Sequence, residues 1–366
     1  MRKLDYLQLT VMLALLAVGC VFIRSIGEQI GTVAAQDYFP RQLIWIAVGT
    51  AAYFCCAVMD YRKLHWRLAA LAVYVLCILL LGAVLIWGKE INGANRWLVF
   101  GQLRLQPSEP AQFAIIAVVA GLFASSAWYL KRGKIFLISA AVTGVPFLLI
   151  VKEPDLGSAM MLMPIYFSLL FAAGLRWRYI IAVLIGLIVL AGFGYYDCQR
   201  ENPLLLRGYQ RDRIRVFLDP SSDIKNRGHN AYQARLAVGS GGFYGKGLGK
   251  GTQNELGFLP QMGAHNDFIF SVIAEESGFS GVLGLLIAYG LLLYSMLRTA
   301  FFAPPYGRLL TVGIATMFFF HIFINVGMSV GVAPVTGLSL PLVSYGGSSI
   351  VTTMAALGLL QSIRIH

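Results

Sequence analysis

Charged residues are scarce in this chain. Only 13% of its 366 residues are charged and 58% are hydrophobic, whereas a soluble globular protein carries about 25% charged residues. The mean hydropathy of +0.70 points the same way. This deficit excludes a soluble enzyme, a disordered protein and a fibrous repeat, and it indicates a protein that meets lipid over most of its length.

Cysteine is also rare, and its spacing excludes a zinc site or a disulfide framework. The five cysteines are Cys20, Cys55, Cys56, Cys77 and Cys198. No pair of them has metal-ligand spacing, and no histidine pair has the His-x-x-x-His pattern.

Long uncharged runs are what the chain has instead. A membrane-spanning helix needs about 20 apolar residues. Seven uncharged runs of that length occur at 6–23, 42–59, 68–87, 110–130, 135–151, 156–175 and 179–196. An eighth span, 268–297, contains Glu275 and Glu276, and the uncharged stretch 309–363 is divided into two spans by Pro334 and Pro341. The sequence therefore predicts an all-α, polytopic integral membrane protein, one domain over 1–366, with ten transmembrane helices and a large outer loop at about 197–266 between helices 7 and 8.

The net charge of +12 is distributed unevenly. If both chain ends are cytoplasmic, the inner segments hold thirteen basic and two acidic residues, and the rest of the chain is nearly balanced. This asymmetry orients the chain by the positive-inside rule. No stretch clusters Lys and Arg as a nucleic-acid-binding arm does, so we expect no nucleic-acid partner.

The N-terminus allows two interpretations. Arg2 and Lys3 precede an 18-residue apolar run, and residues 33–35 resemble a signal-peptide cleavage site. The run exceeds the 7 to 15 apolar residues of such a peptide, which favours an uncleaved first span.

The polar residues gather in three outer segments, 88–109, 197–266 and 333–345, and we expect the chemistry there. Residues 229–238 have the pattern of a short amphipathic helix. In the following stretch, 239–251, seven of thirteen residues are glycine, and Lys246 and Lys250 lie among them. Such a stretch can cradle phosphate oxygens with its N–H groups, or it can be a tight surface loop whose glycines allow positive φ.

Asp267 stands at the mouth of the eighth span. A charge in a membrane helix is costly, so a carboxylate here needs a partner, a metal or a catalytic task. Desolvation would raise its pKa toward that of a general base at neutral pH. The alternative is an N-cap, since Asp is favoured at helix starts.

Further charges crowd the outer membrane boundary. They are Arg96, Arg104, Glu109, Lys152 and Asp155. They indicate either snorkelling and capping at helix ends or a polar cavity for an anionic lipid headgroup.

At the C-terminal end, 325–349 reads Asn-Val-Gly-Met-Ser-Val-Gly-Val-Ala-Pro-Val-Thr-Gly-Leu-Ser-Leu-Pro-Leu-Val-Ser-Tyr-Gly-Gly-Ser-Ser. This segment resembles the signature of the shape, elongation, division and sporulation (SEDS) family, the RodA/FtsW proteins of bacterial wall synthesis. Shorter motifs at 93–97, 106–109, 154–157, 239–242 and 267–271 are similar to family motifs and occur in family order. Residues 251–260 look more like the RodA branch.

The resemblance implies a peptidoglycan glycosyltransferase that polymerises lipid II into glycan strands during wall elongation. Asp267 matches the family's essential aspartate, which we interpret as the general base, with a divalent ion (Mg or Mn) nearby as an option and no organic cofactor. A diphosphate leaving group needs positive charge or metal. The candidate substrate-binding residues are Arg96, Arg104, Glu109, Asp155, Arg211, Arg213, Lys246, Lys250, His265, Ser344 and Ser348.

The resemblance also implies a class B penicillin-binding protein as partner within a wall-elongation complex, packed beside helices eight and nine. It implies a bacterial cytoplasmic membrane location with the active face outward. Two alternatives stay open: a lipid II flippase, and the division or sporulation paralogue of the family. Because charges gather at the outer boundary rather than the bilayer midplane, we favour the enzyme.

Three positions depart from the family pattern. Gln112 stands where the family often has Lys, Gln261 where it usually has Glu, and Asn266 where Thr is common. The first departure removes a Glu–Lys pair with Glu109.

Overall fold

The computed structural model describes residues 4–32, 36–63, 67–91, 94–100, 103–125, 132–175, 227–256 and 264–366, with isolated residues between 181 and 197. Within this part of the chain, seven helices are long and apolar enough to cross a membrane, and two further apolar helices are shorter. The predicted seventh span, 179–196, lies mostly outside the described residues.

The apolar helices follow the predicted uncharged runs closely. In chain order they are α1 (Tyr6–Ile30), α3 (Tyr38–Val58), α4 (Arg67–Trp87), α5 (Ser108–Ala124), α7 (Arg132–Lys152), α8 (Leu156–Ala172), α13 (Ile269–Phe302), α14 (Pro305–Val330) and α15 (Gly347–Ile365). A short 3-10 helix, η1 (Tyr61–Lys63), follows α3.

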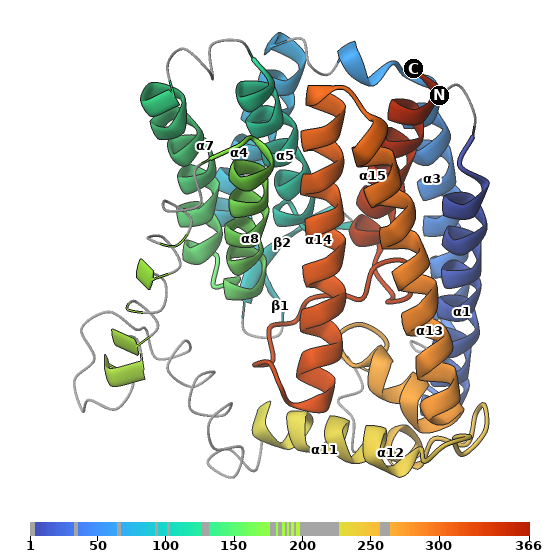
Figure 1. Ribbon diagram of the computed structural model, residues 1–366. Helices are drawn as coiled ribbons and strands as arrows, with labels where there is room; N and C mark the ends of the chain where they lie inside the picture. The colour runs from blue at the N-terminus through green and yellow to red at the C-terminus, as the bar shows by residue number, and fades with distance from the viewer. Residues whose placement is uncertain are drawn as a thin grey trace.

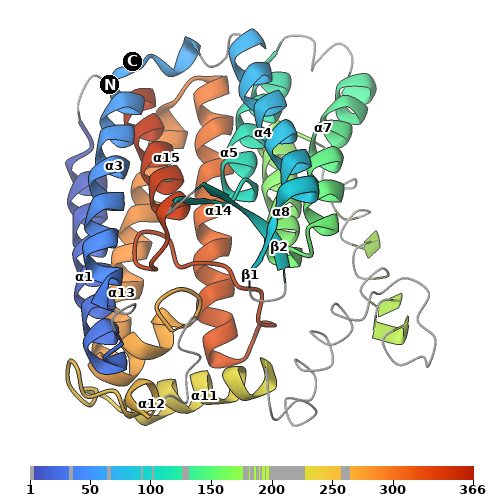
Figure 2. The same ribbon diagram turned by 180° about the vertical axis from the view of Figure 1, so that it is seen from behind.

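The helices form two groups that meet at α14. Helices α1, α3, α13 and α15 lie on one side, and α4, α5, α7 and α8 lie on the other (Figures 1 and 2). α14 packs against α13 in the first group and against α5 and α8 in the second. Both chain ends lie at the same end of the bundle (Figure 1). There the buried Asp5 accepts a 2.7 Å hydrogen bond from Ser295 Oγ and pairs with Arg364.

Glycines allow the helices to approach closely, as is common in membranes. A Cβ at Gly358 would lie 2.2 Å from the Tyr53 carbonyl oxygen, and one at Gly313 would lie 2.6 Å from Ile116. On the outside, large apolar side chains such as Val58, Ile86 and Phe301 are exposed. A surface of this kind suits hydrocarbon rather than water.

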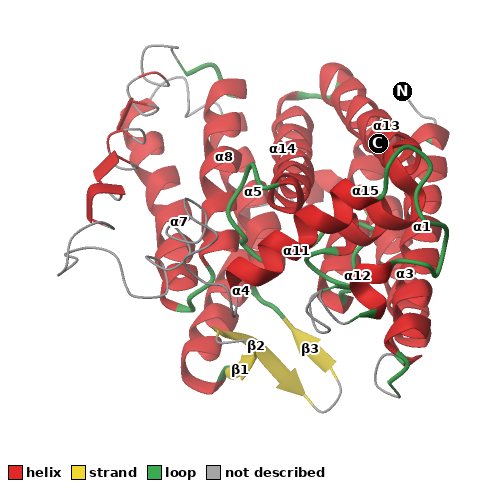
Figure 3. Cartoon of the chain, turned by 90° about the horizontal axis from the view of Figure 1, so that it is seen from below, coloured by secondary structure: helices red, strands yellow, loops and turns green. Residues whose placement is uncertain are grey.

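A small antiparallel sheet corrects the all-α expectation. Its strands are β1 (Lys89–Ile91), β2 (Ala94–Phe100) and β3 (Leu103–Leu105), in the order β1-β2-β3 (Figure 3). In its register, Leu98 lies opposite Leu105. The segment between α4 and α5 is too short and polar to cross the bilayer, and pairing its strands satisfies the backbone groups that helices would otherwise satisfy.

The end opposite the chain ends is closed by α11 (Arg227–Ser240) and the short α12 (Thr252–Glu255), which lie across the bundle (Figure 1). α11 confirms the short helix predicted at 229–238. Nearby, α13 is interrupted at Gly278, where φ is +66°. The interruption divides α13 into two parts. Residues Ile269–Ala274 before it are buried, whereas many residues of the longer part after Gly278 are exposed.

Candidate functional site

Asp267 lies in the turn 264–268, directly before α13, and is half-buried. The N-cap residue of α13 is Phe268, so Asp267 precedes the cap position. The N-cap alternative therefore does not account for Asp267.

Two side chains from the C-terminal signature hold this turn. Asn325 Nδ2, on α14, donates to the Asp267 carbonyl oxygen at 2.9 Å and to the Leu338 carbonyl oxygen at 2.7 Å. Ser344 Oγ donates to the Asn266 carbonyl oxygen at 2.7 Å and accepts from the Leu340 amide at 2.8 Å. Ser344 thus connects the backbone of the Asp267 turn to the backbone of the signature segment.

Arg96 and Asp267 meet at Gly337. A Cβ added at Gly337 would lie 3.4 Å from Asp267 Oδ2 and 3.6 Å from both terminal guanidinium nitrogens of Arg96. The φ angle of Gly337 is +79°, a conformation that other residues rarely adopt. The glycine therefore lets a carboxylate and a guanidinium group from distant parts of the chain share one small space.

Asp155 holds Arg96 from the other side. Its Oδ1 lies 3.5 Å from Arg96 Nη1, in a pair whose side chains are 1% and 14% exposed. Asp155 also N-caps α8, accepting from Ser158 N at 3.2 Å and Ser158 Oγ at 2.7 Å, and it accepts from Gln106 Nε2 at 2.9 Å. Asp155 is thus held in place by hydrogen bonds from Ser158 and Gln106, and it fixes the position of the Arg96 guanidinium group.

Glu153 lies two residues earlier, in the turn that follows α7. It is 1% exposed, and neither of its carboxylate oxygens has a hydrogen-bond partner among the described residues. Burial, and to a smaller extent the charge of Asp155, raises the pKa of Glu153 to about 8.

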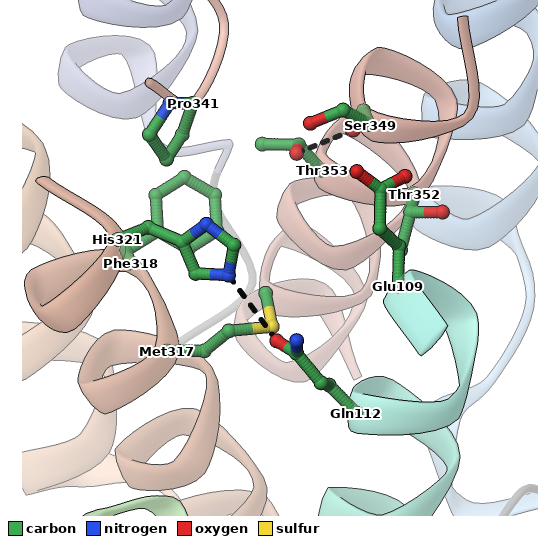
Figure 4. A pocket seen from close by; sticks show the side chains of 9 residues that line it. All are labelled: Glu109, Gln112, Met317, Phe318, His321, Pro341, Ser349, Thr352 and Thr353. Carbon is green, nitrogen blue, oxygen red and sulfur yellow. Dashed lines mark hydrogen bonds between the residues drawn. The ribbon is translucent and has the colours of Figure 1, made fainter. Parts of the chain in front are cut away.

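Glu109 lies in the first turn of α5 and lines a small cavity of about 20 Å³ between α5, α14 and α15 (Figure 4). The side chains of Ser348 and Ser349, at the start of α15, lie next to its carboxyl group. Ser348 is thus placed beside Glu109. The cavity is also lined by Gln112 and His321, whose side chains point toward each other in Figure 4.

His265 lies in the same turn as Asp267 and is buried among aromatic rings. Its ring stacks on Tyr38 with centroids 4.0 Å apart, and Tyr345 meets it edge-on at 5.2 Å. The Tyr345 amide donates to the His265 carbonyl oxygen at 2.9 Å. His265 therefore packs the turn against α3 and the signature segment.

The glycine-rich loop 239–251 binds the interrupted part of α13. The amides of Lys246 and Gly247 donate to the carbonyl oxygens of Glu275 and Glu276, each at 2.9 Å. Lys246 Nζ pairs with Glu275 Oε1 at 2.6 Å. Because these donors are already engaged, the structure favours the tight-loop interpretation over a phosphate cradle for this part of the loop.

Each of the two glutamates within α13, Glu275 and Glu276, accepts hydrogen bonds from residues of other elements. Glu275 also accepts from Thr252 Oγ1 at 3.0 Å, and Glu276 accepts from Ser25 Oγ at 2.8 Å and Gln29 Nε2 at 2.6 Å. Lys250 is exposed at the loop surface. Lys246 therefore belongs to a second group with Glu275 of α13, separate from Arg96 and Asp267.

Three predicted site residues are not placed by side chain. Arg211 and Arg213 lie outside the described residues. Arg104 is described only by its backbone, which lies opposite Val99 in the sheet.

A preformed metal site is absent from the part of the chain that the structure describes, where no cluster of three His, Cys, Asp or Glu side chains occurs. The described groups at Gly337 supply one carboxylate, Asp267, next to a guanidinium group. This donor set fits a divalent ion only in the way Mg²⁺ is often held, by one or two carboxylates together with phosphate oxygens of a substrate.

Sequence reasoning missed Asn325, His321 and Gly337 as site residues. All three lie within or just before the signature segment, and a buried amide or imidazole in an apolar span was the available signal.

Comparison with known proteins shows the family to which the chain is similar. The family model for FtsW, RodA and SpoVE, described as cell cycle protein, matches residues 5–366. The chain is 37% identical to the peptidoglycan glycosyltransferase MrdB of Escherichia coli over 99% of this chain and 94% of the relative. It is 36% identical to a probable peptidoglycan glycosyltransferase FtsW of Geobacter metallireducens, over 99% of this chain and 95% of the relative.

Two solved structures are similar over nearly the whole chain. One comes from work on the coordination of polymerisation and crosslinking by a peptidoglycan synthase complex, with a TM-score of 0.82 and 31% identity over 99% of this chain and 98% of that chain. The other is the rod shape determining protein RodA of Thermus thermophilus, with a TM-score of 0.71 and 31% identity over 99% of this chain and 97% of that chain.

Proposed function

Because the chain belongs to the FtsW, RodA and SpoVE family, we propose that it polymerises lipid II on the outer face of the membrane, with Asp267 as the general base. The chain is an integral membrane protein and a peptidoglycan glycosyltransferase. The observation that carries the proposal is the meeting of the Asp267 carboxylate and the Arg96 guanidinium group at Gly337.

In the proposed reaction, Asp267 accepts the proton of the acceptor GlcNAc 4-hydroxyl group. The hydroxyl oxygen attacks the anomeric carbon of the MurNAc at the end of the growing strand, with inversion from α to β. Undecaprenyl diphosphate leaves, and it needs positive charge more than it needs an acid. Arg96 supplies that charge, and Asp155 keeps the guanidinium group in place.

We assign supporting roles to the neighbouring residues. Glu109 lines the small cavity between α5 and α15 with Ser348 beside it, and Ser344 fixes the Asp267 turn, so these residues would support the backbone around the bound sugar-diphosphate part of the substrate. A divalent ion, Mg²⁺ or Mn²⁺, would bind through Asp267 and substrate phosphate oxygens and would supply further positive charge. Arg104, Arg211, Arg213, Lys246, Lys250 and His265 remain candidates for substrate contact.

We also propose the finer topology. The protein would have ten transmembrane helices, both chain ends in the bacterial cytoplasm and its active face outward. Because ten is an even number, the two chain ends would lie on the same side of the membrane. Two observations support this: both ends lie at one end of the bundle (Figure 1), and thirteen basic residues fall on the inner segments.

The proposed partner is a class B penicillin-binding protein in a wall-elongation complex. It is supported by the similarity to a chain from a peptidoglycan synthase complex. Elongation rather than division is supported by the similarity to MrdB and RodA, although an FtsW is almost as similar.

The first test is lipid II polymerisation by the purified protein together with its transpeptidase, comparing Asp267 with Asp267→Asn. The substitution keeps the size and removes the base, so we expect the rate of glycan synthesis to fall by about 100-fold or more. The matched control is Asp37→Asn, which removes an exposed carboxylate paired with Arg41 and should leave the rate unchanged. Adding a chelator to the unmodified complex tests the divalent ion.

Full polymerisation by Asp267→Asn, with normal folding, would exclude Asp267 as the base. If the unmodified complex made no polymer but moved lipid II across proteoliposome membranes, the flippase alternative would replace the enzyme.

A further inference from the structure

His321 lies in the interior of α14 and connects two parts of the molecule. Its Nδ1 lies 3.4 Å from the carbonyl oxygen of Ser339, and its Nε2 lies 3.2 Å from Oε1 of Gln112 on α5 (Figure 4). Ser339 belongs to the signature segment, two residues after Gly337. His321 therefore bridges α5 and the segment next to which Arg96 and Asp267 meet.

The chemistry of these contacts restricts the imidazole. A carbonyl oxygen can only accept, so Nδ1 carries a hydrogen. Nε2 then either accepts from the Gln112 amide group as a neutral ring or donates to Oε1 as an imidazolium. In both arrangements the ring orientation is fixed by two partners, and Gln112 turns its other amide atom toward the cavity.

Gln112 lines the cavity, so its side-chain amide can present either Oε1 or Nε2 to His321. Gln112 is 1% exposed, and its Nε2 has no hydrogen-bond partner among the described residues; the same holds for Glu109 Oε2 on the cavity wall. A buried donor and a buried acceptor, one helical turn apart on α5, thus both border the same space. The Gln112 amide can therefore turn either of its polar atoms toward His321 without breaking another hydrogen bond among the described residues.

α14 holds the signature segment at two successive carbonyl groups. His321 binds Ser339, and Asn325, one turn further along the same helix face, binds Leu338 and Asp267. The Ser339 hydroxyl is also within 2.9 Å of the Ser349 hydroxyl on α15. The backbone at 337–340 is thereby tied to α5 through His321 and to the Asp267 turn through Asn325.

We propose that His321 is a positioning residue for glycosyl transfer: it fixes the 337–340 backbone against α5 and so keeps Gly337 between Arg96 and Asp267. The inference rests on the proposed function for its catalytic consequence. It does not require His321 to touch the substrate, because a displacement of about 1 Å at a reacting group can cost two orders of magnitude in rate.

The test compares His321→Leu with His321→Gln. Leucine removes both hydrogen bonds, whereas glutamine keeps a donor and an acceptor. We expect His321→Leu to lower the rate at saturating lipid II by at least about tenfold with little change in the half-saturating concentration, and His321→Gln to retain most of the rate. The matched control is Phe319→Leu, on the same helix but half-exposed on its outer face, which should behave as the unmodified protein.

Two further measurements separate positioning from folding. In a double-mutant cycle, Gln112→Leu combined with His321→Leu should be no slower than His321→Leu alone, since both act through one connection. Hydrogen–deuterium exchange at 331–346 should be faster in His321→Leu and unchanged in His321→Gln and Phe319→Leu, while exchange in α13 and α15 stays the same.

Unchanged polymerisation and unchanged exchange in His321→Leu would overturn the proposal, as would equal losses in the leucine and glutamine variants. If the unmodified protein made no polymer, the proposed function would fail, but exchange at 331–346 would still decide whether His321 fixes this segment.

Discussion

Two carboxylates near the start of α8 differ in what surrounds them. Asp155 accepts hydrogen bonds from Ser158, Gln106 and Ser108, whereas Glu153 is equally buried without a donor among the described residues. A buried carboxylate without donors is disfavoured in its charged form. At the residue scale, the consequence is a dependence of stability on pH.

The pKa of Glu153 in the folded protein is about 8, above the ordinary value of 4.5. Between those values the folded state binds a proton that the unfolded state has released, so stability falls as pH rises, by at most about 1.4 kcal/mol per unit. We predict that Glu153→Gln removes much of this fall and raises the unfolding temperature at pH 8 more than at pH 5. Thermal unfolding in detergent at both pH values measures it.

The control for Glu153 is Glu28→Gln, which changes an exposed carboxylate paired with Arg24 and should show no pH-dependent gain. An equal change at pH 5 and pH 8 in Glu153→Gln would contradict the raised pKa.

Some residues of the candidate site stand out in the sequence and others do not, for a physical reason. Asp267 and Arg96 are charges at membrane boundaries, so they stand out against an apolar background. His321 and Asn325 lie inside an uncharged run, where a single neutral polar residue does not change the hydropathy. Their partners are backbone carbonyl groups brought near by folding, which no residue pattern encodes.

At the element scale, the uncharged runs predicted the helices well but ended too early where charges are paired. The run 6–23 stops before Arg24, whereas α1 continues to Ile30: Arg24 and Glu28 form an exposed i,i+4 pair at 2.8 Å, while Ser25 and Ile26 between them are buried. The sheet at 89–105 was not predicted, since its strands are short and each is stabilised by the next rather than by its own sequence.

The backbone of the glycine-rich loop 239–251 lies directly against the backbone of α13 at Gly245 and Gly278. A Cβ at Gly278 would lie 2.2 Å from the Gly245 amide nitrogen, and one at Gly245 would lie 2.2 Å from the Glu276 carbonyl oxygen. Both residues also have positive φ, of +66° and +80°. The two backbones touch where α13 is interrupted, and no side chain fits between them.

We therefore predict that Gly278→Ala and Gly245→Ala each lower the free energy of unfolding by about 2–4 kcal/mol, from strain and overpacking combined. Thermal unfolding of the purified variants measures the loss. Gly239→Ala is the matched control: it lies in α11 with nothing within 4 Å of its Cβ position, and alanine there should be neutral or slightly stabilising. Equal stability of all three variants would show that the loop does not need the close approach.

Across the whole molecule, the charge asymmetry predicts both chain ends on one side of the membrane, and both chain ends lie at one end of the bundle. The inner segments predicted to be basic include Arg364, which pairs with Asp5 at the end of the bundle where both chain ends lie. The location of both chain ends at one end of the bundle agrees with the even number of spans predicted from the sequence, whereas the orientation remains a prediction from the charge bias. The helix that would contact the proposed partner is an expectation from the family resemblance alone.

One face of α13 is suited to another transmembrane helix. Leu283, Gly284, Ile287, Leu291 and Tyr294 follow helical spacing and are exposed. Gly284 has nothing within 4 Å of its Cβ position, and a small residue on an exposed stripe lets a second helix approach closely. If the proposed penicillin-binding protein packs here, side-chain bulk at Gly284 should weaken the complex.

We predict that Gly284→Leu lowers the fraction of transpeptidase that co-purifies with the protein several-fold, the effect expected from losing about 1 kcal/mol of helix packing. Gly82→Leu is the matched control, because Gly82 lies on α4 in the other helix group and also has nothing within 4 Å. Co-purification must be compared at equal expression, with thermal unfolding confirming that both variants fold. Since both substitutions add the same bulk to a lipid-facing helix, a loss confined to Gly284→Leu would place the partner on α13, and equal recovery from both would place it elsewhere.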